Sequence, residues 1–97
     1  MTAHLIWHPA AVDEFHAAVA WYEQQRPGLG IEFAAACRSA LALIRDRPRV
    51  FRLVHGEVRR VVLRRFPYAI FYRSREAELL VLAVMHERRD PRRWRER

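Results

Sequence analysis

Hydrophobic residues recur at helical spacing in the first part of the chain. The recurring positions are three, four and three residues apart: Val12, Phe15, Val19 and Tyr22. Alanines between them raise helix propensity. This pattern predicts a helix that begins at Pro9, because proline is tolerated in a first helical turn, and that ends before Pro27 and Gly28.

A second helical pattern follows and is ended by Pro48. Its apolar stripe consists of Ile31, Ala34, Cys37, Leu41 and Ile44, widened by Phe33, Ala40 and Leu43. Small residues in this segment allow a close approach to a neighbouring helix. Two helices joined by a short loop predict a helical hairpin over residues 9–48.

The remaining apolar segments have the character of strands. Leu5, Ile6 and Trp7 predict a strand within residues 1–7, and residues 57–86 predict an antiparallel sheet. Within that sheet the strands are expected at 58–63, 68–72 and 79–85, with the polar residues 74–77 as a connection. Alternate residues of the middle strand should face the helices, and the last strand should be covered on both faces. The predicted fold class is α+β: an N-terminal strand and a helical hairpin packed on a mainly antiparallel sheet of three to four strands.

Length and composition indicate one folded domain over residues 1–97, since 52% of the residues are hydrophobic and 30% are charged. The lone Cys37 excludes an internal disulfide and is expected in the core. The longest apolar run, residues 79–85, is far below the roughly 20 residues that span a bilayer. No targeting segment is recognisable, so a cytoplasmic protein without a membrane partner is expected.

Charge is distributed very unevenly, and every basic residue is an arginine. Residues 1–44 hold two arginines against four acids, a net charge of −2, whereas residues 45–97 hold sixteen against seven, a net charge of +9. Such a segment favours a negatively charged partner, either a nucleic acid or an acidic protein. We expect these arginines to form one continuous face; the alternative is a solvated surface without a dedicated partner.

Only His86 stands out as a candidate for proton transfer. It is expected at the end of the last strand, beside Arg88 and Arg89, where it would act as a general acid or base or serve a structural, hydrogen-bonding role. The other histidines and the single cysteine do not have the spacing of a metal site, and no nucleotide-binding or hydrolase motif occurs. Neither a metal nor a cofactor is therefore expected. Residues 90–97 form a basic C-terminal tail, in which Asp90 is predicted to cap a short helical turn through Trp94.

Four segments, taken in order, resemble the RelE/ParE superfamily of bacterial type II toxins, and more closely its ParE branch. They are Ala20-Trp21-Tyr22-Glu23 with Pro27-Gly28-Leu29-Gly30 and Phe33; Arg59 through Tyr68; Ile70-Phe71-Tyr72; and Val81 through Pro91 with Trp94 and Arg97. The resemblance implies a helical hairpin on a twisted antiparallel sheet. It also implies a small antitoxin as partner, acidic and folding on binding. A homodimer or a larger toxin–antitoxin assembly is possible.

Two activities occur in this superfamily: ParE-like members inhibit DNA gyrase, and RelE-like members cut messenger RNA on the ribosome. RelE-like ribonucleases typically place an arginine after the middle-strand aromatic, where this chain has Ala69 after Tyr68, and often carry a C-terminal tyrosine that is missing here. The resemblance therefore favours gyrase inhibition, with ribosome-dependent cleavage as the alternative and a non-toxic, antitoxin-binding relic as the second alternative. The expected contact residues are Arg59, Arg64, Arg65, Arg88, Arg89 and Trp94. A ribonuclease would instead use His86 with Arg59, Arg65 and Arg88 as proton carrier and phosphate clamps.

Overall fold

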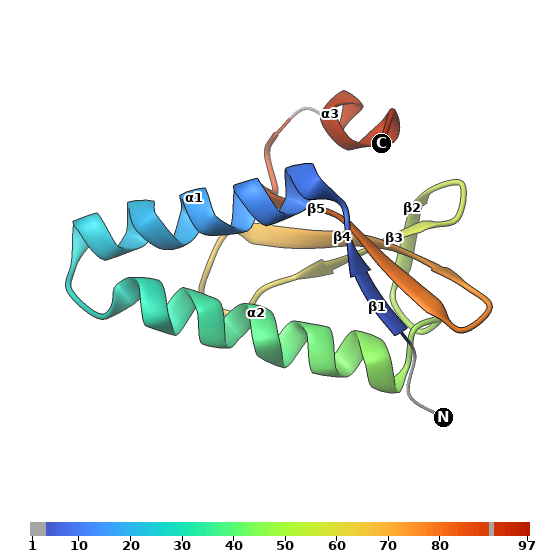
Figure 1. Ribbon diagram of the computed structural model, residues 1–97, viewed down its shortest axis with the longest axis horizontal. Coiled ribbons are helices and arrows are strands. Elements are labelled where there is room, and N and C mark those ends of the chain that lie inside the picture. The colour runs from blue at the N-terminus through green and yellow to red at the C-terminus, as the bar shows by residue number, and fades with distance from the viewer. Residues whose placement is uncertain (1–3, 90) are drawn as a thin grey trace.

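A five-stranded mixed sheet forms the centre of the protein in the computed structural model, which describes residues 4–89 and 91–97. The strands are β1 (His4–Trp7), β2 (Arg52–His55), β3 (Val58–Val62), β4 (Tyr68–Arg75) and β5 (Glu78–His86), and the helices are α1 (Pro9–Gln25), α2 (Leu29–Asp46) and α3 (Arg92–Arg95) (Figure 1). The strand order is β1-β5-β4-β3-β2, with β1 parallel to β5 and the other pairs antiparallel. The predicted α+β class is confirmed, with a slightly larger sheet than expected.

Strand β2 was not predicted. It pairs with β3 through a two-residue turn in which Gly56 has a φ of 55°, a left-handed conformation that glycine adopts without strain. The connection between β4 and β5 is shorter than the predicted residues 74–77, because β4 continues to Arg75 and β5 begins at Glu78. A strand of four mostly exposed residues carries little hydrophobic periodicity, so its partner rather than its own sequence defines it.

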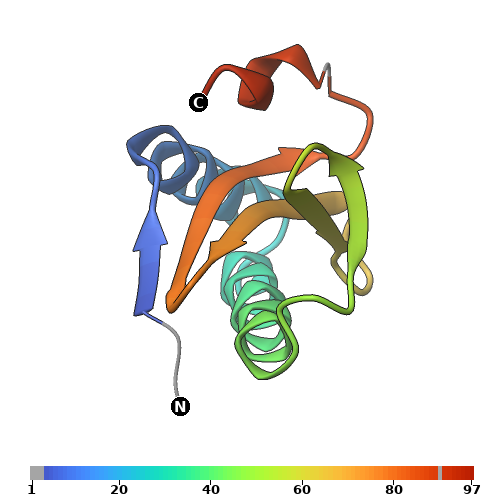
Figure 2. The ribbon, with the colours of Figure 1, turned by 90° about the vertical axis from the view of Figure 1, so that its right-hand side faces the viewer.

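The two long helices run antiparallel and both cover one face of the sheet (Figures 1 and 2). Their turn depends on Gly28, whose φ is 89°, and on Gly30, where a Cβ would lie 2.7 Å from the carbonyl oxygen of Val19. The Glu23 carboxylate accepts the backbone N–H groups of both glycines, each at 2.9 Å. The hairpin is therefore closed by backbone proximity as well as by side-chain packing. No helix in the described ranges is long and apolar enough to cross a membrane.

The main core lies between the hairpin and the sheet. Phe33 is 0% exposed and its ring lies 5.1–6.3 Å from four other aromatic rings. Those rings belong to Phe15, Tyr22, Phe66 and Tyr68. The alternate aromatic residues of the middle strand face the helices as predicted, and Cys37 is buried as predicted.

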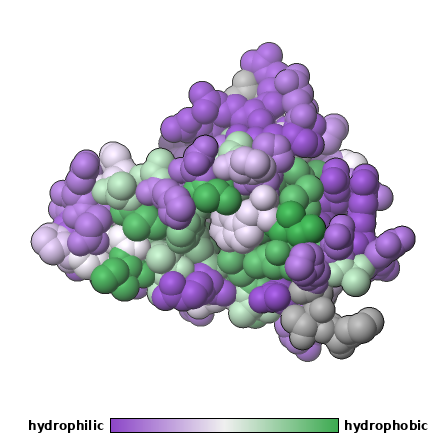
Figure 3. Space-filling model, in the orientation of Figure 1, coloured by the Kyte–Doolittle hydropathy of each residue, from purple (hydrophilic) through white to green (hydrophobic). Residues whose placement is uncertain are grey.

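The predicted stripe of α2 is wrong at two positions. Ile31 is 71% exposed and Leu43 is 56% exposed, whereas Phe33, Cys37 and Ile44 are buried. Helix α1 and the sheet contact only one side of α2. The apolar stripe predicted from the sequence is wider than that side, so Ile31 and Leu43 at its margins are exposed. Figure 3 accordingly shows hydrophobic residues at the surface along the two long helices, and hydrophilic residues over α3.

A smaller core covers the second face of the sheet. It consists of Val58, Ala69, Phe71, Leu82, Ala83, Met85 and Trp94. Trp94 comes from α3, is 3% exposed and stacks on Phe71 with the ring centroids 4.8 Å apart. The predicted helical turn through Trp94 is present, while the predicted cap, Asp90, lies outside the described residues.

Arg97 anchors the C-terminal segment to the rest of the domain. Its guanidinium donates to both carboxylate oxygens of Glu14 in α1, at 2.9 and 2.6 Å, and to the carbonyl oxygen of Leu82 at 2.8 Å. Glu14 also accepts the N–H of Val84 at 3.1 Å. The pairing of β1 with β5 ends at Val81, next to the point where the register between β4 and β5 shifts. The bonds from Arg97 and Glu14 therefore satisfy the Leu82 carbonyl and the Val84 N–H, which β1 does not reach.

Candidate functional site

The arginines of the second half do not form one continuous face, so that prediction is wrong. The Arg59 guanidinium donates to the carbonyl oxygen of Phe51 at 2.8 Å, beside β2. Arg75 bonds the Glu57 carboxylate at 2.7 Å, and Arg97 is directed at Glu14. Successive residues of a strand point to opposite faces of the sheet, so the adjacent Arg59 and Arg60 of β3 diverge.

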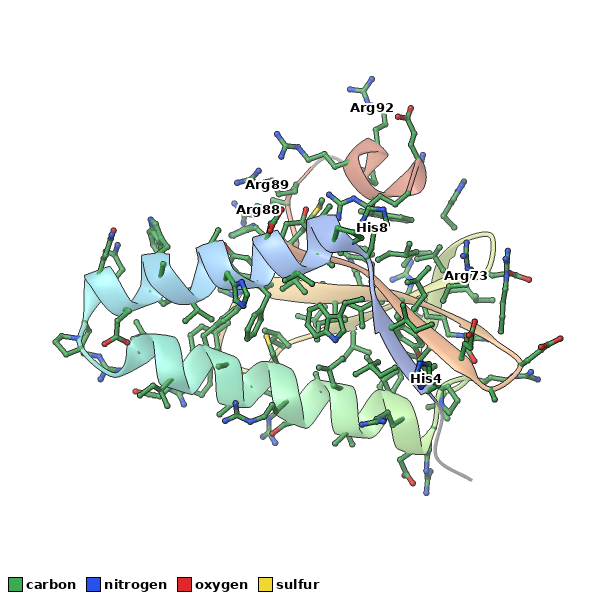
Figure 4. All side chains as sticks on the ribbon, in the orientation of Figure 1. His4, His8, Arg73, Arg88, Arg89 and Arg92 are labelled. Carbon is green, nitrogen blue, oxygen red and sulfur yellow. The ribbon has the colours of Figure 1, made fainter. Side chains whose placement is uncertain are left out.

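One end of the sheet nevertheless gathers four of the predicted contact residues. The N–H of Glu87 donates to the carbonyl oxygen of Pro67 at 2.9 Å, so the β3–β4 connection meets the end of β5. We call this region the basic end; its arginines are Arg64, Arg65, Arg88 and Arg89. In Figure 4, Arg88 and Arg89 lie close to the end of β5, far from Arg73. The strand connections thus bring together two arginine pairs that are far apart in the sequence.

Arg65 is the member of the basic end that is already paired. It donates to the Glu32 carboxylate of α2 at 2.7 Å, and Arg26 donates to the same carboxylate at 2.9 Å. The hydrogen bonds from Arg65, and then from Arg26, lower the pKa of Glu32. Both arginines are more than half exposed, so the pairing orients Arg65 more than it stabilises the fold. Arg64, Arg88 and Arg89 make no salt bridge to a carboxylate among the described residues.

A cavity of about 560 Å³ lies between α1 and the end of β5, and we call it the α1 pocket. Its lining residues are Glu14, Ala17, Ala18, Trp21, Tyr22, Pro67, Tyr68, Val84, Met85, His86, Arg89 and Arg93. Trp21 is 54% exposed, and the ring of His86 lies 5.7 Å from that of Tyr68. Cationic groups beside aromatic rings can bind a partner that combines a negative charge with an apolar or planar group.

His86 has one ring nitrogen that is engaged. Its Nδ1 accepts the backbone N–H of Arg88 at 3.2 Å, so in the neutral ring the proton is on Nε2. The residue therefore has the structural role that the sequence allowed, while Nε2 remains for a second hydrogen bond.

A second hollow of about 410 Å³ lies between α2 and β3, and we call it the α2 groove. It is lined by Glu32, Ala35, Ala36, Ser39, Ala40, Leu43, Val61, Val62, Leu63, Arg64, Arg65 and Phe66. The small residues on this side of α2 leave the space open. Sequence analysis missed this groove, because its two walls are far apart in the chain.

Other candidate residues have structural positions. Trp94, expected to contact a partner, is buried against Phe71. His4 and His8 lie at opposite ends of β1 (Figure 4), and His8 Nδ1 accepts the N–H of Ala10 at 3.1 Å, capping α1. In residues 4–89 and 91–97, no three metal-binding side chains of His, Cys, Asp or Glu gather.

A helical hairpin packed on a mainly antiparallel sheet is the fold that the resemblance to the RelE/ParE superfamily implied. Residues 5–91 match the family described as ParE toxin of type II toxin-antitoxin system, parDE, and the chain belongs to that family. Membership implies an antitoxin partner. A solved structure titled "Chromosomal ParDE TA system from P. aeruginosa" is similar in fold, with a TM-score of 0.77 and 17% identity, covering 88% of this chain and 96% of that chain. A search of curated proteins finds no significant match.

Proposed function

We propose that this ParE-family toxin arrests bacterial growth by binding DNA gyrase in the cytoplasm, and that a cognate antitoxin neutralises it. The supporting observation is the basic end, where Arg64, Arg88 and Arg89 are available to an acidic surface or to DNA held by gyrase. The mechanism is binding, with no bond made or broken by this chain. The antitoxin is acidic and folds on binding, which suits the net charge of +9 over residues 45–97.

The sheet face covered by α3 also supports binding rather than RNA cleavage. Ala69, at the position where RelE-like ribonucleases typically place an arginine, is 0% exposed. It belongs to the small core that Trp94 and Phe71 complete. Apolar side chains of β3, β4, β5 and α3 pack around Ala69 on this face.

A supercoiling assay with purified gyrase and purified toxin tests the proposal. We expect inhibition by the native chain and at least about tenfold weaker inhibition when Arg64, Arg88 and Arg89 are all changed to glutamate, since each change reverses a charge. Arg38→Glu, an exposed charge reversal on α2 away from the basic end, is the matched control and should inhibit normally. Full supercoiling at saturating native toxin would refute gyrase as the target.

Ribosome-dependent cleavage of messenger RNA is the second candidate, because His86 lies in the α1 pocket with Arg89 beside it. Because Nδ1 accepts the N–H of Arg88, Nε2 carries the ring proton and can donate it to a leaving oxygen, which is the role of a general acid. A translating extract decides between the two: message cleavage that His86→Ala abolishes would favour the ribonuclease. Induction without growth arrest would instead indicate a relic that only binds its antitoxin.

A further inference from the structure

One side of α1 forms a wall of the α1 pocket. The α1 residues at the centre of this wall follow one another at the helical spacing of three, four and seven positions: Glu14, Ala17, Ala18 and Trp21. The two alanines leave space between the longer side chains at either end. Trp21 is more than half exposed, and its ring meets that of Tyr22 edge-on with the centroids 5.1 Å apart. Helix α1 therefore presents an indole ring beside a hollow.

The opposite wall comes from the sheet and the segment after it. Tyr68 begins β4 and pairs with His86 at the end of β5, so the two rings lie on one face of the sheet, 5.7 Å apart. Arg89 follows β5 and lies beside α1 in Figure 4, and Arg93 comes from α3. Both arginines are exposed, and neither makes a salt bridge to a carboxylate within the part of the chain that the structure describes. Four elements thus bring aromatic and cationic groups together.

The polar groups of this lining that remain available are mainly hydrogen-bond donors. The guanidinium groups of Arg89 and Arg93 can only donate, and the neutral ring of His86 carries its proton on Nε2. The carboxylate of the lining, Glu14, is already bound through both oxygens by Arg97, at 2.9 and 2.6 Å. A ligand that fits must therefore bring acceptor oxygens and negative charge, and the aromatic walls favour a planar ring.

We propose that the α1 pocket binds a nucleoside 5′-phosphate, with the base beside Trp21 and Tyr68 and the phosphate on Arg89 and Arg93. Aromatic side chains stack on the flat face of any base, and a guanidinium binds two phosphate oxygens at once. The volume of about 560 Å³ lies within the range of about 300–1,000 Å³ that is usual for small-molecule sites. A free nucleotide and the phosphorylated end of a single strand present this same chemistry. The site is independent of the function proposed above, since gyrase takes no part in it.

The test adds adenosine 5′-monophosphate to the ¹⁵N-labelled native chain. The chain has three tryptophans, so three indole N–H resonances report on three places. The resonance of Trp21 should shift more than those of Trp7 and Trp94. Adenosine lacks the charge and inorganic phosphate lacks the base, so each should bind at least about tenfold more weakly than the nucleotide. No shift of Trp21 at about 10 mM nucleotide, or equal binding of adenosine, would overturn the proposal.

Two sets of variants locate the contact. Ala17→Trp fills the pocket and should weaken nucleotide binding at least about tenfold, whereas Ala20→Trp, exposed on α1 outside the lining, should change it less than about twofold. Arg89→Gln with Arg93→Gln should reduce the affinity for the nucleotide to that for adenosine, and Arg38→Gln, on α2, should not. Binding by Ala17→Trp that is as tight as binding by the native chain would overturn the proposal.

Two further ligands identify the source of the nucleotide and exclude a peptide. A 5′-phosphorylated trinucleotide that binds at least about tenfold more tightly than the mononucleotide would assign the site to the end of a strand, and equal binding to free nucleotide; either result supports the site. The peptide Asp-Trp-Asp combines the same charge and planarity. If it binds at Trp21 more tightly than the nucleotide, the pocket is a protein contact and the proposal is overturned. If the native chain fails to inhibit gyrase and the nucleotide still shifts Trp21, only the proposed function fails.

Discussion

Replacing Phe33 with alanine should remove the centre of the main core. Phe33 is 0% exposed and lies 5.1–6.3 Å from the four aromatic rings described above. Buried Phe→Ala substitutions cost about 3–5 kcal/mol, the lost transfer free energy plus a cavity term. A domain of this size unfolds with a free energy of about 5–15 kcal/mol, so the variant loses a large share of it.

Urea denaturation followed by circular dichroism measures the effect. We expect the unfolding free energy of Phe33→Ala to fall by about 3–5 kcal/mol and its Tm by at least about 12 °C. Ile31→Ala is the control, because Ile31 is 71% exposed and its change should stay within about 0.5 kcal/mol. If Phe33→Ala unfolds at the native urea midpoint with an unchanged slope, the packing between hairpin and sheet is wrong.

Three further changes test the hairpin, the core thiol and the C-terminal segment. Gly30→Ala should lower the unfolding free energy by about 1–3 kcal/mol in thermal melts, because its Cβ would meet a backbone oxygen at 2.7 Å. Burial raises the pKa of the Cys37 thiol to about 12, so a thiol reagent at about pH 8 should modify it only on unfolding. The thiol of the unfolded chain ionises at a lower pH than the buried thiol of the folded chain. The stability that the buried neutral thiol contributes is therefore present below about pH 9 and is lost as the pH rises towards 12. Arg97→Ala should cost about 1–3 kcal/mol by leaving the Glu14 carboxylate without its partner, and should speed hydrogen exchange in α3; exchange at the native rate would contradict the anchoring role.

The candidate site could be predicted only in part. Arg64, Arg65, Arg88 and Arg89 stand out by charge and by their family motifs, and they do lie at one end of the sheet. Trp94 was chosen for its family motif and its place in the basic C-terminal tail. It instead packs on the second face of the sheet, because the apolar side chains of that face are buried by it. The α2 groove had no sequence signal at all, since its two walls, α2 and β3, are far apart in the chain.

The sequence by itself determined the helical hairpin, the strand character of residues 58–86 and the family. Helical and strand periodicities and the turn residues act over a few neighbours, so they can be read along the chain. Tertiary structure alone decided which arginines are paired, as in Arg65 with Glu32 and Arg97 with Glu14, and which side chains line the α1 pocket. Those outcomes depend on contacts between residues tens of positions apart, and only the packed fold sets such distances.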